Sequence, residues 1–475
     1  MLDSPRQSGD SSKNGHVLRP RAAARPTARG RTDFPVNSNA MSTCARIPDW
    51  PTLDATARRK LSVTAAERAR RLEPRLNAFV SIEDHLPDVD GNLGGLPYAV
   101  KDIFRTASHR PTGGLATATD VGVDGETDLL ARLDGAGARR VGFTALTELA
   151  YEPSGYNHAR GRVRNPWNPD FVAGGSSSGS AAAVASGSVV VALGSDTAGS
   201  LRIPAHCCGV TAWKPTYGIV SCTGIMPLAP SLDTVGLLAR GACDLQDAVH
   251  ILIGDPQTDG SVARVAAMTD CIDAAEPSVR RACLQGIDAV EAAGARLEQR
   301  TGLAEIEAAG AHALVILQVE AARVHRAHME DPNIPALLRK RLGKGLAIDD
   351  ATLAISRSVR ETLSHDFTAR IFGAADAIIL PVMPICVPRA VETDPASDKF
   401  SPATLYALSR FTRFVNLLGF PAVAIPVGFD DQKLPVALQI VGRPHSDRTL
   451  LALAQAVQDR TDWHARVPAA IADEL

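Results

Sequence analysis

Residues 174–204 read GGSSSGSAAAVASGSVVVALGSDTAGSLRIP and place two serine-rich clusters, 174–180 and 194–200, around one apolar run. Segments rich in glycine and serine are usually flexible linkers, but a linker does not enclose a hydrophobic run. The small residues 180–186 favour a helix, and the β-branched run 189–193 favours a buried strand. The stretch therefore predicts a helix and a strand, joined by polar turns, inside a folded domain.

Helix and strand signals alternate along the rest of the chain. Periodic apolar residues predict helices over 64–76, 127–138, 242–252, 278–297 and 448–459. Short apolar runs, two of which stop at proline, predict strands over 95–102, 140–143, 377–381, 422–426 and 436–441. This interleaving predicts the α/β class, with a central mixed β-sheet covered by helices on both faces. No internal linker interrupts residues 46–475, so we expect them to form a single large domain.

Composition excludes several classes of function. Hydrophobic residues make up 45% of the 475 residues, which is ample for a large core, and the formal net charge is only −2. A chain with this balance has no general attraction to nucleic acid or to an anionic membrane. Aromatic residues make up only 4%, and no apolar run approaches the roughly 18 residues of a transmembrane helix. We therefore expect no nucleic-acid partner and no membrane partner.

The eight cysteines are scattered, and they form no CxxC pair and no Cys/His cluster with zinc spacing. Such a pattern is typical of reduced thiols in a cytoplasmic protein. It predicts a cytoplasmic location, no disulfide framework and no metal. We expect no cofactor either.

Residues 1–45 differ from the rest of the chain. The first 40 residues contain seven Lys or Arg against three Asp, with prolines, serines and glycines between them. No apolar stretch there resembles a secretory signal peptide. The composition favours a disordered basic tail. Met41 begins more ordinary sequence, which leaves an upstream start-codon artefact as the alternative.

Two familiar interpretations of the Gly/Ser turns fit poorly. Residues 175–179 satisfy the G-x-S-x-G elbow of α/β-hydrolases, but that elbow needs a hydrophobic strand directly before it. Pro166 and Pro169 stand in that place, and prolines argue against a central strand. A phosphate-binding P-loop would end in Gly-Lys-Ser or Gly-Lys-Thr, and no such ending follows.

A third interpretation is a serine nucleophile at the start of a helix. Ser200 follows the predicted strand and a tight turn, and residues 201–208 can begin a helix. Backbone N–H groups of residues 197–200 would then be available as an oxyanion hole. A serine also needs a base. Lys101, at the end of a predicted strand, can serve as that base if burial lowers its pKa.

These residues resemble the signature of the amidase signature family of serine amidohydrolases. The resemblance rests on GGSSSGSAAAVASG and LGSDTAGSLRIPA, and on LPYAVKD at residues 96–102, which is similar to the family's lysine strand. Further similar segments follow in the family's order at 147–150, 164–167, 208–216, 419–428 and 434–439. Ser178 and Ala198 stand where many members have glycine. The resemblance covers roughly residues 48–459 and implies a single amidase-signature domain.

The resemblance implies a Ser–cis-Ser–Lys triad. Matched motif by motif, Ser200 falls on the nucleophile, Ser176 on the cis-serine and Lys101 on the lysine. Neutral Lys101 would withdraw a proton from Ser176, which withdraws one from Ser200, and the reverse relay would protonate the leaving amine. The expected residues of the oxyanion hole and of substrate binding are Thr197, Ala198, Gly199, Ser177, Asp196 and Arg202.

The function implied by the resemblance is that of an amidase that hydrolyses a small-molecule linear amide through an acyl-enzyme at Ser200. Residues 337–360 lack the tyrosine-rich helix associated with the amidase-like component of glutamyl/aspartyl-tRNA amidotransferase, so that component is the second interpretation. A urea-derivative hydrolase of the allophanate or biuret type is the third. A catalytically silent binding protein on the same fold is the alternative from another class. The resemblance also implies a homodimer.

Overall fold

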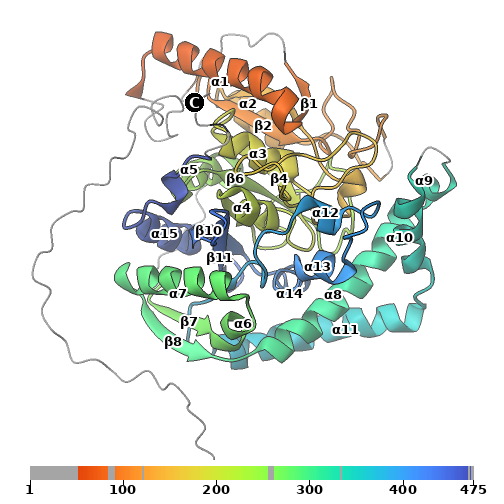
Figure 1. Cartoon of the computed structure of the whole chain (residues 1–475), viewed down its shortest axis with the longest axis vertical. Coiled ribbons are helices and arrows are strands. Elements are labelled where there is room, and N and C mark those ends of the chain that lie inside the picture. Colours follow the sequence, from red (N-terminus) through yellow and green to blue (C-terminus); the bar gives the residue numbers. More distant parts are fainter. Residues whose placement is uncertain are drawn as a thin grey trace, which may run out of the picture. The chain divides into compact units, whose positions relative to one another are not determined.

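A mixed sheet of eleven strands runs through the computed structural model, which describes residues 52–83, 91, 93–119, 122–254, 262–331, 334–468 and 471 (Figure 1). The tail predicted over residues 1–45 lies outside these residues. In spatial order the strands are β1 (Phe79–Ile82), β3 (Arg139–Thr144), β2 (Pro97–Lys101), β4 (Val191–Asp196), β6 (Thr234–Ala239), β5 (Thr211–Lys214), β10 (Ala422–Phe429), β11 (Pro435–Gly442), β9 (Ala377–Pro381), β7 (Arg264–Met268) and β8 (Arg296–Arg300).

The centre of one half of the sheet is parallel. Strand β2 lies between β3 and β4 and runs parallel to both, whereas β4 pairs with β6 in the antiparallel sense. Strands β2 and β4 therefore end at the same edge of the sheet. Ligand sites of open α/β sheets lie outside the carboxyl ends of parallel strands. This edge is where Lys101 and the second serine-rich cluster meet.

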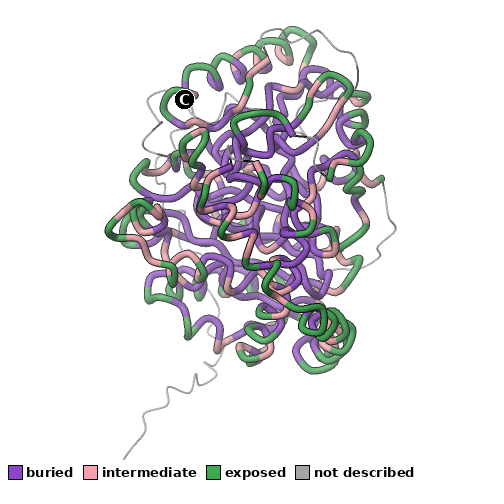
Figure 2. Tube along the Cα trace, turned by 90° about the vertical axis from the view of Figure 1, so that its right-hand side faces the viewer, coloured by how far each residue is buried: buried purple, intermediate pink, exposed green. Residues whose placement is uncertain are grey.

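Helices cover both faces of the sheet, because alternate strand residues point to opposite sides. On one face, Tyr98 and Val100 belong to a core that includes residues of α2 (Leu129–Gly135), α5 (Ala242–Ile253), α7 (Pro277–Ala292) and α15 (Asp447–Gln458). On the other face, Ala99 belongs to a core with residues of α1 (Ala55–Leu76), α3 (Ser178–Ala185) and α4 (Arg202–Cys208). The predicted mixed sheet with helices on both faces is confirmed. Figure 2 shows the buried trace in the middle and exposed turns on the outside.

A second group of helices extends the other half of the sheet. Helix α8 (Leu303–Val324) and α14 (Arg413–Leu418) pack against Ile378 and Leu380 of β9. The remaining helices of this part are α6 (Thr269–Asp273), α9 (Arg326–Glu330), α10 (Ala336–Leu346), α11 (Asp350–Asp366), α12 (Ala390–Thr393) and α13 (Pro402–Ala407). Several of them form the walls of the cavity described below.

Two predicted helices have different bounds in the structure. Helix α1 begins at Ala55 rather than at residue 64, because the Asp54 carboxylate accepts the Ala57 N–H at 2.8 Å and caps its first turn. The helix predicted over 278–297 ends at Ala292, and strand β8 begins at Arg296. Residues 296–300 are RLEQR, and this charged run carries no apolar strand pattern. Its strand conformation comes from parallel pairing with β7.

Three further observations concern the described residues. None of their helices is long and apolar enough to cross a membrane. Within the same residues, no group of three or more His, Cys, Asp or Glu side chains could hold a metal ion. The seven cysteines of the described part are all free thiols.

Candidate active site

The parallel pairing of β2 and β4 brings a lysine to a serine at the carboxyl edge of the sheet. Val100 lies opposite Leu193, so the next residues of both strands reach the same edge. There Lys101 Nζ lies 2.8 Å from Ser195 Oγ. It also lies 2.8 Å from Ser176 Oγ, which comes from the loop before α3. Lys101 and Ser176, two of the predicted triad residues, are therefore in hydrogen-bond contact.

The loop that carries Ser176 approaches a neighbouring backbone closely. The Gly175–Ser176 peptide bond is cis, and the Gly175 N–H donates to Pro153 O at 2.7 Å. A Cβ at position 175 would lie 2.6 Å from Glu152 O. Only glycine allows the two segments to come this close.

Ser177 joins this loop to the turn after β4. Its backbone N–H donates to Ser200 O at 3.2 Å, and its Oγ donates to Ser195 O at 3.1 Å. The side chain is fully buried. Ser177, expected to support the oxyanion hole or the substrate, is placed where it holds the loop of Ser176 against β4.

Ser200 lies in the turn between β4 and α4, and it lines a cavity. The backbone of Gly199 has a φ of 124°, which disfavours any residue with a side chain. A Cβ there would also collide with the Thr412 Oγ1. Ser200 retains 8% of its exposure, whereas Lys101 and Ser176 retain none. The arrangement runs from a buried amine to a hydroxyl at the cavity wall.

The buried environment of Lys101 favours its neutral form. Burial lowers its pKa from 10.5 to about 7, against the opposing effect of the Asp233 and Asp196 carboxylates. When neutral, the amine has two N–H donors and one lone pair. One N–H can be donated to Ser195 while the lone pair accepts the proton of Ser176.

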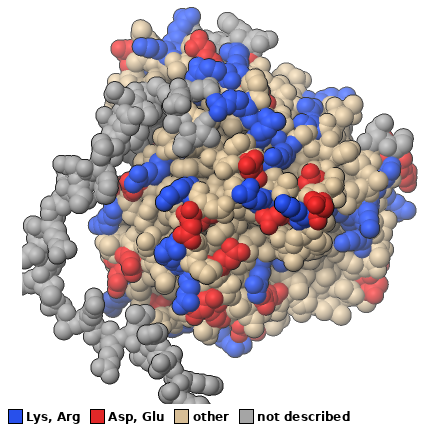
Figure 3. All heavy atoms as spheres, viewed as in Figure 1, with Lys and Arg blue, Asp and Glu red and all other residues tan. Residues whose placement is uncertain are grey.

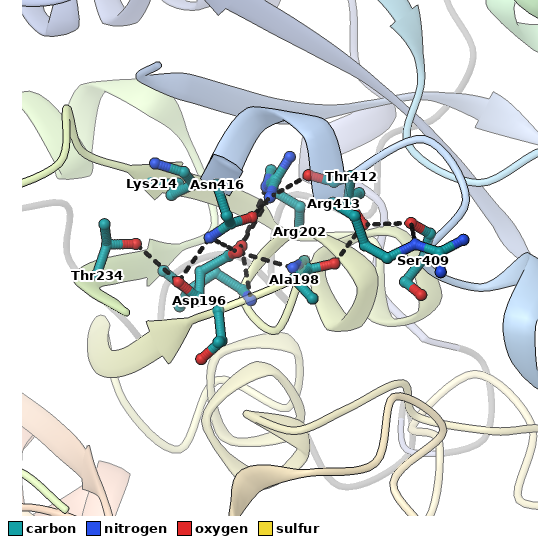
Figure 4. Close-up of polar contacts among 12 residues, drawn as sticks. Asp196, Ala198, Arg202, Lys214, Thr234, Ser409, Thr412, Arg413 and Asn416 are labelled. Atoms are coloured by element: carbon teal, nitrogen blue, oxygen red, sulfur yellow. Dashed lines mark hydrogen bonds and ion pairs between the residues drawn. The ribbon is translucent and has the colours of Figure 1, made fainter. Parts of the chain in front are cut away.

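A buried ion pair lies directly behind the turn of Ser200 (Figure 4). Arg202 Nε and Nη2 each donate to the Asp196 carboxylate at 3.0 Å. The guanidinium also donates to Gln439 Oε1 at 2.8 Å, to Asn416 Oδ1 at 2.7 Å and to Thr412 O at 3.1 Å. Both charged side chains have an exposed fraction of 0%. Although burial acts to raise it, the Arg202 guanidinium lowers the pKa of Asp196 to about 2.

Asp196 orients the turn, and this changes the expected set of oxyanion donors. Its Oδ1 accepts the Gly199 N–H at 2.8 Å. That N–H is therefore already paired and points toward the ion pair. Of the four amides expected to form an oxyanion hole, the N–H groups of Thr197, Ala198 and Ser200 remain as candidates. Gly199 contributes its backbone conformation.

Thr197 and Ala198 lie at the cavity, and each is anchored from outside the turn. The Thr197 Oγ1 donates to Asp233 Oδ1 at 2.5 Å. The Thr412 Oγ1 donates to Ala198 O at 2.5 Å. Thr412 lies just before α14, so a helix more than 200 positions away in the sequence positions the turn (Figure 4).

The cavity beside Ser200 has a volume of about 330 Å³. Helices α8, α10 and α13 form much of its wall. The lining is largely apolar and includes Leu228, Leu314, Leu317, Leu337, Phe400 and Leu405. Four cationic side chains also line it: Lys340, Arg341, Lys344 and Arg413. Asp196 and Arg202, expected to bind substrate, lie outside this lining with fully buried side chains.

Sequence reasoning missed three residues of this site. Ser195 directly precedes Asp196 in the motif, and a polar residue at the end of a buried strand is a signal that could have identified it. Thr412 and Asn416 belong to no motif. Their contacts with the turn depend on the packing of α14, which no local pattern indicates.

The comparison with protein families decides the family. The model of the Amidase family matches residues 64–451, which is most of the chain. The chain belongs to the Amidase family. Within this Amidase chain, the matched residues include Lys101, both serine-rich clusters and the helices that line the cavity.

Relatives of this Amidase chain include amidotransferase components. The GatA-type component of glutamyl-tRNA(Gln) amidotransferase from Chromohalobacter salexigens is 32% identical, and the alignment covers 86% of this chain and 95% of that protein. The solved structure of the same component from Thermotoga maritima has a TM-score of 0.76 at 29% identity, covering 88% of this chain and 95% of that one. A crystal structure of an amidase has a TM-score of 0.77 at 28% identity, covering 87% and 98%.

Proposed function

We propose that this chain hydrolyses a carboxamide through an acyl-enzyme on Ser200. The observation that carries the proposal is the buried contact of Lys101 with Ser176, next to a serine that reaches the cavity. Burial favours the neutral lysine that a proton relay needs. Family membership supports amidohydrolase chemistry.

The proposed reaction has two halves. Ser200 Oγ bonds to the carbonyl carbon while its proton passes to Ser176, and the proton of Ser176 passes to Lys101. The tetrahedral intermediate then breaks its C–N bond, and the relay returns the proton to the departing ammonia or amine. Water attacks the acyl-enzyme along the same relay and releases the carboxylic acid, which restores Ser200. Amides of the 197–200 turn would stabilise the oxyanion.

The cavity supports a substrate with an apolar acyl group. Six of its lining residues are leucine or phenylalanine side chains, from Leu228, Leu314, Leu317, Leu337, Phe400 and Leu405. Burying an apolar chain there is favourable by about 25 cal/mol for each Å² removed from water. A linear aliphatic or aromatic amide is therefore the substrate class that we infer.

A second candidate is the ammonia-releasing half-reaction of a glutamyl-tRNA(Gln) amidotransferase, with glutamine as the amide donor. The names of the relatives favour it. So do the cationic side chains of the cavity, since Arg341 and Arg413 could bind the α-carboxylate of glutamine.

Ammonia release distinguishes the two candidates. We expect purified chain to hydrolyse hexanamide or benzamide with a kcat/KM at least about tenfold above that for L-glutamine, because one or two buried methylene or aromatic groups contribute that much. The measurement is ammonia production across both amide types at equal concentration. A preference for glutamine would exclude the apolar substrate class and favour the amidotransferase function.

The rate of hydrolysis should rise with pH and then level off. The relay needs neutral Lys101, whose pKa is about 7, so protonation below that pH removes the base. We expect kcat/KM to fall about tenfold for each pH unit below 7 and to be flat above about 8. The measurement is the pH dependence of kcat/KM for one amide.

Lys214 offers a matched control for this pH dependence. It is also fully buried, and burial lowers its pKa to about 7. Its Nζ donates to Pro215 O at 2.8 Å, and the side chain does not line the cavity. A Lys214→Met variant should retain the inflection near pH 7, whereas Lys101→Met should lose hydrolysis. An inflection that disappears only in Lys214→Met would contradict the assignment to Lys101.

A further inference from the structure

A second hollow lies at the carboxyl end of α1, and its lining shares no residue with the cavity at Ser200. This groove has a volume of about 690 Å³. The last turns of α1, strand β1 and residues 160–164 form its walls. On the face shown in Figure 3, Lys and Arg side chains gather over α1 and beside it.

The groove is firmly held together. Asn77, which ends α1 with a φ of 51°, donates from Nδ2 to the carbonyl oxygens of Arg160 and Gly161 at 3.1 Å. Arg164 Nη1 donates to Pro74 O and to Arg75 O at 3.2 Å, which satisfies carbonyls at the end of the helix. These bonds fix two segments that are about 85 positions apart in the sequence.

Four arginines line the groove: Arg70, Arg160, Arg162 and Arg164. Three of them are anchored through one nitrogen to backbone carbonyls, which leaves the rest of each guanidinium for other partners. Arg162 differs, because its Nη1 is buried and has no hydrogen-bond partner among the described residues. A buried donor without a partner is uncommon and costs stability. It is explained if a ligand supplies the acceptor.

The acidic groups near the groove do not cancel this charge. Glu73 is the acidic residue of the described lining, and its Oε2 accepts the N–H groups of Ala78 and Phe79 at 3.0 Å. Burial raises its pKa to about 7, so it is partly neutral near that pH. Asp170 interacts with Arg162 through space, but its carboxylate lies 4.0 Å from Arg389.

We propose that this groove binds the phosphate group of a small molecule. Guanidinium groups donate paired N–H bonds to phosphate oxygens with matching geometry, and the unpaired nitrogen of Arg162 supplies one such donor. Among the described residues, the lining contains no aromatic side chain on which a base could stack. With a chain net charge of −2, a confined arginine groove favours a small phosphorylated ligand over a nucleic acid.

Titration calorimetry with inorganic pyrophosphate at low ionic strength tests this proposal. We expect wild-type chain to bind with one site and Arg162→Gln to bind at least about tenfold more weakly, because a hydrogen bond to a charged group contributes that much. Arg162→Lys should recover only part of the affinity. Thermal unfolding of both variants would verify that they are folded. Equal affinity of wild type and folded Arg162→Gln, or no binding by wild type, would overturn the proposal.

Arg341→Gln is the matched control, since it removes the same charge from the cavity beside Ser200. We expect it, and Ser200→Ala, to bind pyrophosphate like the wild type. Loss of binding in Arg341→Gln alone would place the anion in the cavity and exclude the groove. A second titration with bulk tRNA should give weaker binding than pyrophosphate. Much tighter binding of tRNA that Arg162→Gln abolishes would replace the small ligand with a nucleic acid.

Discussion

A Ser200→Ala variant should lose hydrolysis of every amide that the wild type accepts, by a factor on the order of 10⁶ in kcat, as removal of the nucleophile does in other serine hydrolases. The physical reason is that the acyl-enzyme cannot form without the Ser200 oxygen, while the buried Ser176 does not reach the cavity wall. The measurement is single-turnover ammonia release, combined with mass spectrometry of a covalent fluorophosphonate adduct. The adduct should map to the peptide that contains Ser200.

Ser409→Ala provides the comparison, because Ser409 is another buried serine that lines the same cavity. Its loss should change kcat by a far smaller factor and leave the adduct on Ser200. Ser200→Ala that is folded and retains more than about 1% of the activity would exclude Ser200 as the nucleophile. So would an adduct on another serine. A folded wild type without activity or adduct on any accessible probe would favour a silent binding protein.

The second large effect is on stability. Replacing Arg202 by Ala should lower the free energy of unfolding by about 3–5 kcal/mol, because it leaves the Asp196 carboxylate buried without its charged partner. Asp196 and Arg202 both have an exposed fraction of 0%. The measurement is urea denaturation at pH 7. The loss should shrink as the pH falls, since burial alone raises the pKa of Asp196 above its unfolded value and protonation then favours the folded state.

A surface ion pair serves as the control for this prediction. Arg280 lies 2.9 Å from Asp273, and both side chains are more than half exposed. Arg280→Ala should cost less than about 1 kcal/mol. The double variant Arg202→Met with Asp196→Asn should recover part of the stability lost in Arg202→Ala, because no buried charge remains. Equal losses for Arg202→Ala and Arg280→Ala would show that the buried pair does not stabilise the turn.

The local elements of the site could be predicted from the sequence. Small residues predicted the helix that became α3, and the β-branched run predicted the strand that became β4. Periodicity and β-propensity act over a few residues, so they identify such elements well. Resemblance to the amidase signature family added the pairing of Lys101 with Ser176, which composition alone did not show.

The rest of the site depends on contacts between distant segments. The parallel pairing of β2 and β4 brings Ser195 to Lys101, and strand order is not encoded in any single segment. Thr412 and Asn416 act on the turn only because α14 packs behind it. Their role follows from tertiary packing, which overrides local preference. The Gly199 amide was expected in the oxyanion hole for the same reason, since its bond to Asp196 is visible only in the folded chain.

The walls of the cavity and the proton relay come from separate parts of the chain. Lys101, Ser176 and Ser200 precede residue 201, whereas α8, α10 and α13 all follow residue 302. Substrate preference can therefore diverge by replacement of the later segments while the chemistry is inherited unchanged. A chimaera built on this principle has to keep Thr412 and Asn416, because these two residues join the exchangeable wall to the turn of the nucleophile.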